Sequence, residues 1–163
     1  MTEAWWIVFG AGLALSALSL FWRPWRAAMR EAEFMKARRL FHYQREHLEA
    51  RFVHLASARS ESKLVRWADC DFDDDAAYVR NRITHRLSAF VAVTVAVDGT
   101  YGPQGAADLI GNLRVGTAIF EFRRGRWDTD GRAMLNLNPN EAIRFYQNDL
   151  EVIDQEFAGH SEA

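Results

Sequence analysis

The sequence predicts an α+β protein with a single N-terminal transmembrane helix, a long amphipathic helix, and an antiparallel sheet of about five strands closed by a C-terminal helix. Three observations carry this prediction: an uncharged apolar stretch near the N-terminus, a following run without Gly or Pro in which apolar residues recur every seven positions, and alternating polar and apolar residues from Leu64 onward. We therefore divide the chain into an anchor (1–23), a long helix (24–60) and an α+β body (61–163).

The predicted anchor is Ala4–Trp22, which contains no charged residue. A helix of about 19 residues rises roughly 28 Å, which is close to the thickness of the hydrocarbon layer of a bilayer. A cleaved signal peptide and a buried core helix are the alternatives, but the chain begins without a basic segment and the stretch holds few polar residues. Tryptophans near both ends are expected at the two membrane interfaces: Trp5, Trp6, Trp22 and Trp25.

The basic residues that follow the anchor predict its orientation. Arg23, Arg26 and Arg30 are expected to contact lipid headgroups, and their excess on this side predicts that the body is cytoplasmic and the N-terminus outside, in the inner membrane of a bacterial-type cell. Small residues within the anchor would allow another membrane helix to approach closely: Gly10, Gly12, Ala14 and Ser16.

The long helix is expected to start near Pro24, at a bend after the anchor, because proline is favoured in a first helical turn. Its charged surface is interrupted by one narrow apolar seam: Phe34, Phe41, Leu48, Phe52 and Leu55. The seam has three interpretations, which are packing on the protein's own sheet, pairing with a partner helix, and lying on the membrane surface. As a partner-helix seam it would allow a homo-oligomer through helix 24–58.

The body reads as a sheet followed by a helix. Five strands are expected, with a Gly-rich loop at 99–112 and a tight turn at Arg124–Gly125: 63–72, 76–82, 87–97, 114–123 and 126–137. Asn138, Pro139 and Glu141 form a helix-start signal. Apolar residues at helical spacing then predict a terminal helix packed on the sheet: Ile143, Tyr146, Leu150, Ile153 and Phe157.

No set of residues in the sequence predicts catalysis. The acidic stretch Asp69–Asp75 lacks the Gly and Glu that a calcium loop needs, and acidic neighbours disfavour a reactive Cys70. The spacing of the three histidines of the long helix does not suit a shared metal. The arginines around Gly125 fit a solvated turn or a contact to an acidic partner better than RNA binding.

Composition and charge limit the function further. The 163 residues are 49% hydrophobic with a net charge of −2, which excludes global disorder and gives no field to attract nucleic acid. We expect a non-catalytic accessory or scaffold subunit of an inner-membrane complex, with no cofactor or metal, whose partners are integral membrane subunits and the lipid bilayer. The alternative is a membrane-tethered small-ligand sensor, since a long helix ahead of a curved antiparallel sheet resembles cystatin-like and NTF2-like layouts.

Overall fold

The computed structural model describes the backbone of residues 3–59, 65–97 and 113–156, and side chains from residue 28 onward within these ranges. The chain divides into two compact units, Met1–Arg39 and Leu40–Ala163. Helix α1 (Glu3–Arg59) begins in the first unit and continues into the second unit. The fold class is α+β, and the described ranges contain one long helix and an antiparallel sheet of six strands.

The sequence suggested that a second helix starts near Pro24. Instead, helix α1 is one continuous element that runs through this position. The expected membrane anchor, its tryptophans and its small residues lie outside the part of the chain whose side chains are described, as do Arg23 and Arg26. Among the described side chains, Arg30 is exposed. No helix in the part searched, which is limited to the described residues, has the length and apolar character needed to cross a membrane.

The first two predicted strands are a single long strand, β1 (Val65–Asn81). It pairs antiparallel with β2 (Leu87–Val97), and the pairing register shifts twice, between Arg66 and Asp71 and between Phe72 and Ala76. Such bulges absorb extra residues and bend a strand without ending it. The sequence predicted that the acidic run separates two strands. Instead, this run lies within one irregular strand.

The predicted strand 126–137 is interrupted. It forms β4 (Arg126–Asp128) and β5 (Ala133–Leu135), and both pair with the same strand, β3 (Leu113–Arg123). The turn between β3 and β4 lies at Arg124–Gly125, as predicted, and both residues have positive φ angles. The predicted loop at 99–112 lies outside the described residues.

The terminal helix is much shorter than predicted. Asn138 caps α2 (Pro139–Phe145) in a complete capping box with Glu141, as the sequence indicated. The chain then turns and forms β6 (Leu150–Glu156), which pairs with β1. Asn148 and Asp149 favour a turn and Val152–Ile153 favours a strand, so the apolar spacing that resembles a helix is divided between two elements.

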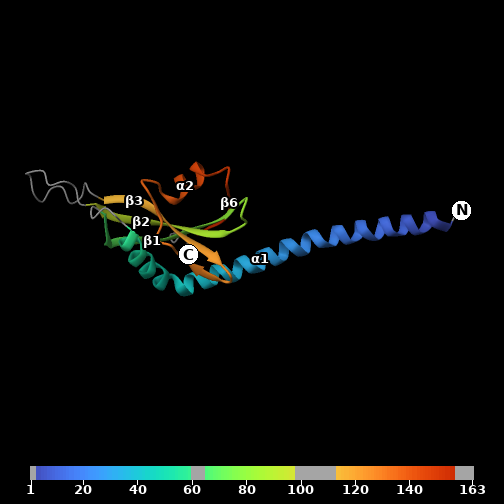
Figure 1. Ribbon diagram of the computed structural model, residues 1–163, viewed down its shortest axis with the longest axis horizontal. Coiled ribbons are helices and arrows are strands. Elements are labelled where there is room, and N and C mark those ends of the chain that lie inside the picture. The colour runs from blue at the N-terminus through green and yellow to red at the C-terminus, as the bar shows by residue number, and fades with distance from the viewer. Residues whose placement is uncertain (1–2, 60–64, 98–112, 157–163) are drawn as a thin grey trace, which may run out of the picture. The chain divides into compact units, whose positions relative to one another are not determined.

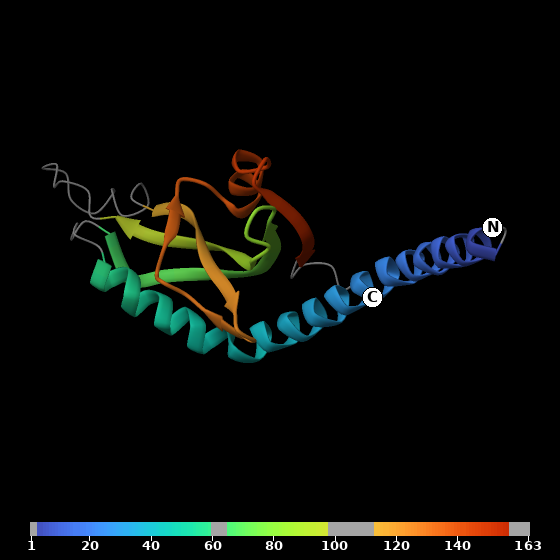
Figure 2. The same cartoon turned by 45° about the vertical axis from the view of Figure 1, so that its right-hand side comes forward.

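The sheet has the order β4-β3-β2-β1-β6, with β5 beside β3. In the second unit the last turns of α1 lie on one side of the sheet and α2 on the other (Figures 1 and 2). The α1 side is an aromatic core. The Phe41 ring packs edge-on against Tyr78, Phe120 and Trp127, with centroids 5.0 to 5.9 Å apart.

The contacts of the aromatic core show what covers part of the apolar seam predicted on the long helix. Phe52 packs against rings of Trp67 and Phe72, and it is buried together with Phe41 and Leu48. In the second unit the protein's own sheet covers this seam, so a partner helix is not needed to bury these three residues. Leu55 is half-buried, and Phe34 belongs to the first unit.

Candidate ligand-binding groove

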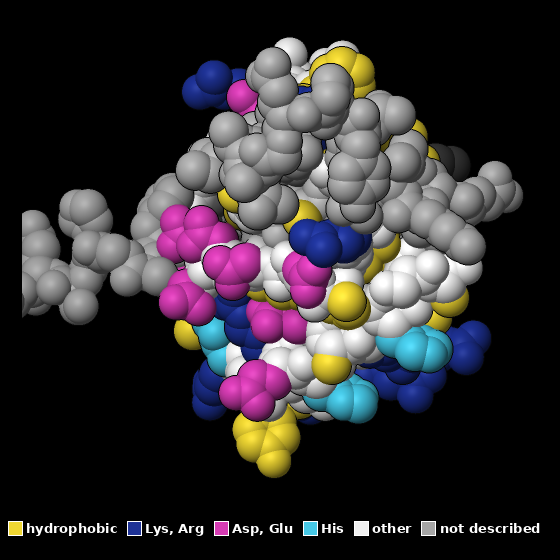
Figure 3. Space-filling view, turned by 90° about the vertical axis from the view of Figure 1, so that its left-hand side faces the viewer, with side chains coloured by type: hydrophobic (Ala, Val, Ile, Leu, Met, Phe, Trp, Pro, Cys, Tyr) yellow, Lys and Arg dark blue, Asp and Glu magenta, His cyan; other side chains and the backbone are white. Residues whose placement is uncertain are grey.

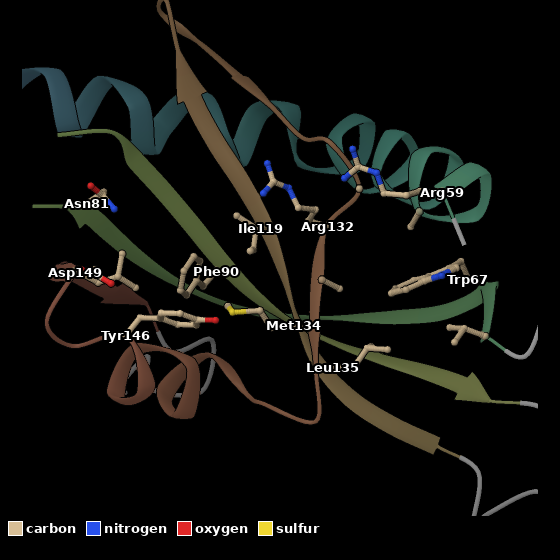
Figure 4. Close-up of a pocket in the computed structure, with 15 residues that line it drawn as sticks. Arg59, Trp67, Asn81, Phe90, Ile119, Arg132, Met134, Leu135, Tyr146 and Asp149 are labelled. Atoms are coloured by element: carbon tan, nitrogen blue, oxygen red, sulfur yellow. The ribbon is translucent and has the colours of Figure 1, made fainter. Parts of the chain in front are cut away.

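A groove of about 930 Å³ opens in the second unit, and seven separate segments contribute to it. They are the end of α1, both ends of β1, the middle strands β2 and β3, the segment 131–135, and the turn after α2. Its volume lies in the range typical of small-molecule sites. Figure 4 shows the lining side chains, from Asn81, Asp149 and Tyr146 at one end to Arg59 and Trp67 at the other.

Most of the lining is apolar, and part of it belongs to a packed cluster. Phe90 is buried with Ala77, Val79 and Ala142, and further groove residues pack against this cluster. A wall built on such a cluster is held in place before a ligand arrives, which reduces the entropy lost on binding. The large apolar lining residues are Trp67, Phe90, Ile119, Met134, Leu135 and Leu150.

The polar residues at one end serve mainly to hold the chain. The Asn81 side-chain oxygen accepts hydrogen bonds from the backbone N–H groups of Ile83 and Thr84, at 3.0 and 2.7 Å. The backbone N–H of Arg82 donates to the carbonyl of Asp149 at 2.8 Å. These bonds fix the β1–β2 turn beside the turn that carries Tyr146, and so define this end of the groove.

The other end is basic. Arg132 Nε lies 2.6 Å and Arg59 Nη1 lies 3.9 Å from the same oxygen of Asp130, so two guanidinium groups share one carboxylate. Partial burial acts to raise the pKa of Asp130, but hydrogen bonds from Arg132 and the charges of Arg132 and Arg59 outweigh it and lower the pKa. The charge excess at this end is positive.

The segment that carries Arg132 is fixed by close packing. Gly131 has φ of +72°, and a Cβ atom there would lie 2.6 Å from the backbone nitrogen of Ala56. The Thr129 hydroxyl donates to the carbonyl of Ile119 at 3.0 Å and accepts from the N–H of Gly131 at 3.2 Å. Only glycine allows the backbone to approach α1 this closely. This close approach separates β4 from β5 and shapes the groove.

The acidic stretch lies apart from the groove lining. Asp69, Asp71, Asp73 and Asp74 are exposed on β1, and Figure 3 shows acidic side chains gathered on one face of the molecule. Arg45 donates to the backbone carbonyls of Asp73 and Asp74, which secures the bulged part of β1 to α1. Within the described ranges, no three His, Cys, Asp or Glu residues are placed to hold a metal ion.

Cys70 and the histidines show no catalytic arrangement among the described residues. Burial and the nearby carboxylates raise the pKa of the Cys70 thiol, which disfavours the thiolate. His47 and His54 are exposed on α1. His42 instead contacts Glu156, a pairing across the fold that sequence spacing could not indicate.

The sequence raised a small-ligand site only as an alternative, and it did not indicate the set of residues that line this groove. Tyr146 and Leu150 were assigned to one helical stripe, although they lie on the turn after α2 and on β6. Arg59 and Arg132 are 73 positions apart and meet only through Asp130. One signal was available, because the Asp130–Gly131 pair inside a predicted strand is typical of an interruption.

No protein-family model matches the chain, and neither the curated proteins nor the solved structures contain a significant match.

Proposed function

We propose that this chain is a non-catalytic, membrane-anchored binding protein whose second unit takes a small amphipathic molecule into the groove between the turn after α2, β5 and the end of α1. The groove is the observation that carries the proposal, because its volume of about 930 Å³ combines a largely apolar lining with a basic end. The predicted anchor and cytoplasmic body would keep this site near the inner membrane.

The chemistry of the lining indicates the kind of ligand. Met134, Leu135 and Tyr146 offer apolar and aromatic surface, and burying a ligand against them contributes about 25 cal/mol per Å² of apolar area. Arg59 and Arg132 share a single carboxylate, so they retain capacity to bind a negative group. An apolar body with one anionic end fits both features.

A fluorescent amphipathic anion, anilinonaphthalene sulfonate, tests the proposal with the full-length chain in a neutral detergent. The Ala133→Phe variant places a ring in the groove, whereas Ala50→Phe adds the same ring on an exposed position of α1. We expect the first variant to weaken probe binding roughly tenfold and the second to leave it unchanged. Equal binding by both variants and the parent chain would refute the groove as the site.

The second candidate function is an accessory subunit of a membrane complex. The specific observation is a set of exposed apolar side chains beside the β1–β2 turn: Ile83 is 78% exposed and Phe145 is 71% exposed. Phe145 and Tyr146 form a ring pair with centroids 4.9 Å apart. Hydrogen bonds from Arg82 to Asp149 and Leu150 hold the turn and this pair at the same end of the sheet.

Crosslinking in native membranes separates the two candidates. An accessory subunit would give a stoichiometric crosslinked partner, and Ile83→Ser with Phe145→Ser would abolish it. The matched pair Tyr43→Ser with Val115→Ser removes exposed apolar side chains elsewhere and should leave the crosslink intact. Recovery of the chain only as a monomer would argue against the accessory role and leave the ligand-binding proposal standing.

A further inference from the structure

A second hollow, of about 570 Å³, lies at the β3–β4 hairpin and is separate from the groove. Phe122 and Asp128 form part of its lining. The rest of the lining is four arginines: Arg86, Arg123, Arg124 and Arg126. Four guanidinium groups around one hollow create a strongly positive local field, although the whole chain carries a net charge of −2.

Two of the arginines are positioned by a neighbouring carboxylate. Arg123 Nε donates to Glu121 Oε2 at 2.6 Å, and Arg86 Nη1 lies 3.9 Å from the same oxygen. Glu121 therefore restrains both side chains and reduces the entropy that a ligand would have to remove. Its single charge offsets only part of theirs.

The other two arginines retain their full binding capacity. Among the described residues, Arg124 and Arg126 form no ion pair, while Asp128 in the lining is engaged by Arg51, whose Nη2 lies 3.1 Å away. The hollow thus presents more positive charge than its own carboxylates balance.

The backbone of the turn supports the same conclusion. Arg124 has φ of +52° and Gly125 has φ of +79°, which is the pattern of a tight hairpin turn that favours Asn or Gly at its first position. Arginine in this left-handed region is strained, and strained residues gather at functional sites. The turn therefore has arginine at position 124, where Asn or Gly would give a more stable backbone.

We propose that this hollow binds a phosphate group, carried by an anionic lipid or by a soluble phosphorylated molecule. The planar fork of arginine matches phosphate oxygens two at a time, and several arginines together can bind a doubly charged group. The volume exceeds that of a phosphate alone, so the rest of the molecule can contact the ring of Phe122.

The position of the hollow makes the lipid source testable. Phe41 packs against Trp127, with centroids 5.0 Å apart, and Trp127 is adjacent to Arg126. The hollow therefore lies close to the part of α1 that begins the second unit at Leu40.

The test uses the full chain in lipid nanodiscs and follows amide hydrogen exchange in residues 121–128. One arm compares discs of phosphatidylcholine with discs that also contain phosphatidylglycerol; the other adds inorganic phosphate to phosphatidylcholine discs. Slower exchange in the first arm assigns the phosphate to a lipid, and slower exchange in the second assigns it to a soluble molecule. Unchanged exchange in both arms overturns the proposal.

Variants separate a built site from general charge attraction. The double variant Arg124→Gln with Arg126→Gln should weaken binding of phosphatidylglycerol or inorganic phosphate roughly tenfold or more, because two charge-assisted contacts are lost. Arg114→Gln with Arg144→Gln removes the same charge from exposed positions outside the hollow and should change binding less than about twofold. Equal losses in the two pairs would overturn the proposal.

A third variant guards against loss of folding. Arg124→Gly relieves the strained backbone, so it should keep or raise the thermal unfolding temperature while weakening phosphate binding. Unweakened binding by this variant, with the unfolding temperature maintained, would show that Arg124 does not take part.

Discussion

His42 on α1 and Glu156 at the end of β6 are joined through the histidine Nε2, which lies 2.8 Å from the carboxylate Oε2. The same oxygen accepts a hydrogen bond from the hydroxyl of Tyr78, at 3.2 Å, and the Tyr78 side chain is completely buried in β1. One carboxylate thus connects the helix, the long strand and the edge strand.

Replacing this carboxylate should destabilise the second unit. Glu156→Ala removes the acceptor of the Tyr78 hydroxyl and the partner of His42, and we expect the free energy of unfolding to fall by about 1.5 to 3 kcal/mol. Glu151→Ala removes an exposed carboxylate from the same strand and should change it by less than about 0.5 kcal/mol. Denaturant titration in detergent measures both; equal effects would contradict the role of Glu156.

The aromatic core gives a second prediction. Phe52 is 0% exposed and contacts rings of Trp67, Phe72 and Phe120, so Phe52→Ala should lower the free energy of unfolding by about 3 to 5 kcal/mol. Tyr43→Ala is the matched control, because this ring on the same helix is 86% exposed and its loss should be nearly neutral. Comparable losses would mean that α1 does not pack as described.

Two glycines with positive φ angles should respond differently to alanine. Gly125→Ala meets only backbone strain, because no atom lies within 4 Å of the added carbon, and about 1 kcal/mol is expected. Gly131→Ala brings the carbon to 2.8 Å from Leu55 and 2.6 Å from Ala56 backbone atoms, so strain and steric overlap together should exceed about 3 kcal/mol. Thermal unfolding of the two variants side by side decides; a similar loss in both would contradict the close approach.

Local signals in the sequence predicted local structure well. The β3–β4 turn at Arg124–Gly125 and the capping box of Asn138 with Glu141 depend on neighbouring residues, and both are confirmed. The strand 87–97 is confirmed because its alternation and β-branched residues act over a single element. Such features need no knowledge of distant partners.

Features set by tertiary pairing were missed. The spacing of Tyr146, Leu150 and Ile153 fits a helix, but pairing with β1 draws Leu150–Glu156 into the sheet. Similarly, contact of Gly131 with α1 interrupts the edge strand. The groove depends on both events, so neither its lining nor the pairing of Arg59 with Asp130 could be predicted from spacing along the chain.

Asp130 at the basic end of the groove gives a pH-dependent prediction. Burial alone would raise its pKa, but Arg132 and Arg59 lower it below the value in the unfolded chain, which is about 3.9. The ion pairs therefore stabilise the fold fully above the unfolded pKa, and this contribution is lost as the pH falls through the lower, folded-state pKa.

The difference in unfolding free energy between the parent chain and Asp130→Asn measures this contribution. Because the Asp130 side chain is 36% exposed, solvent screening should keep the difference below about 1 kcal/mol. It should be constant between about pH 7 and 5 and shrink below about pH 4. In an Arg132→Gln background both the difference and its pH dependence should diminish, since the main cationic partner is absent. A difference that grows on acidification would show that burial, rather than the two arginines, governs Asp130.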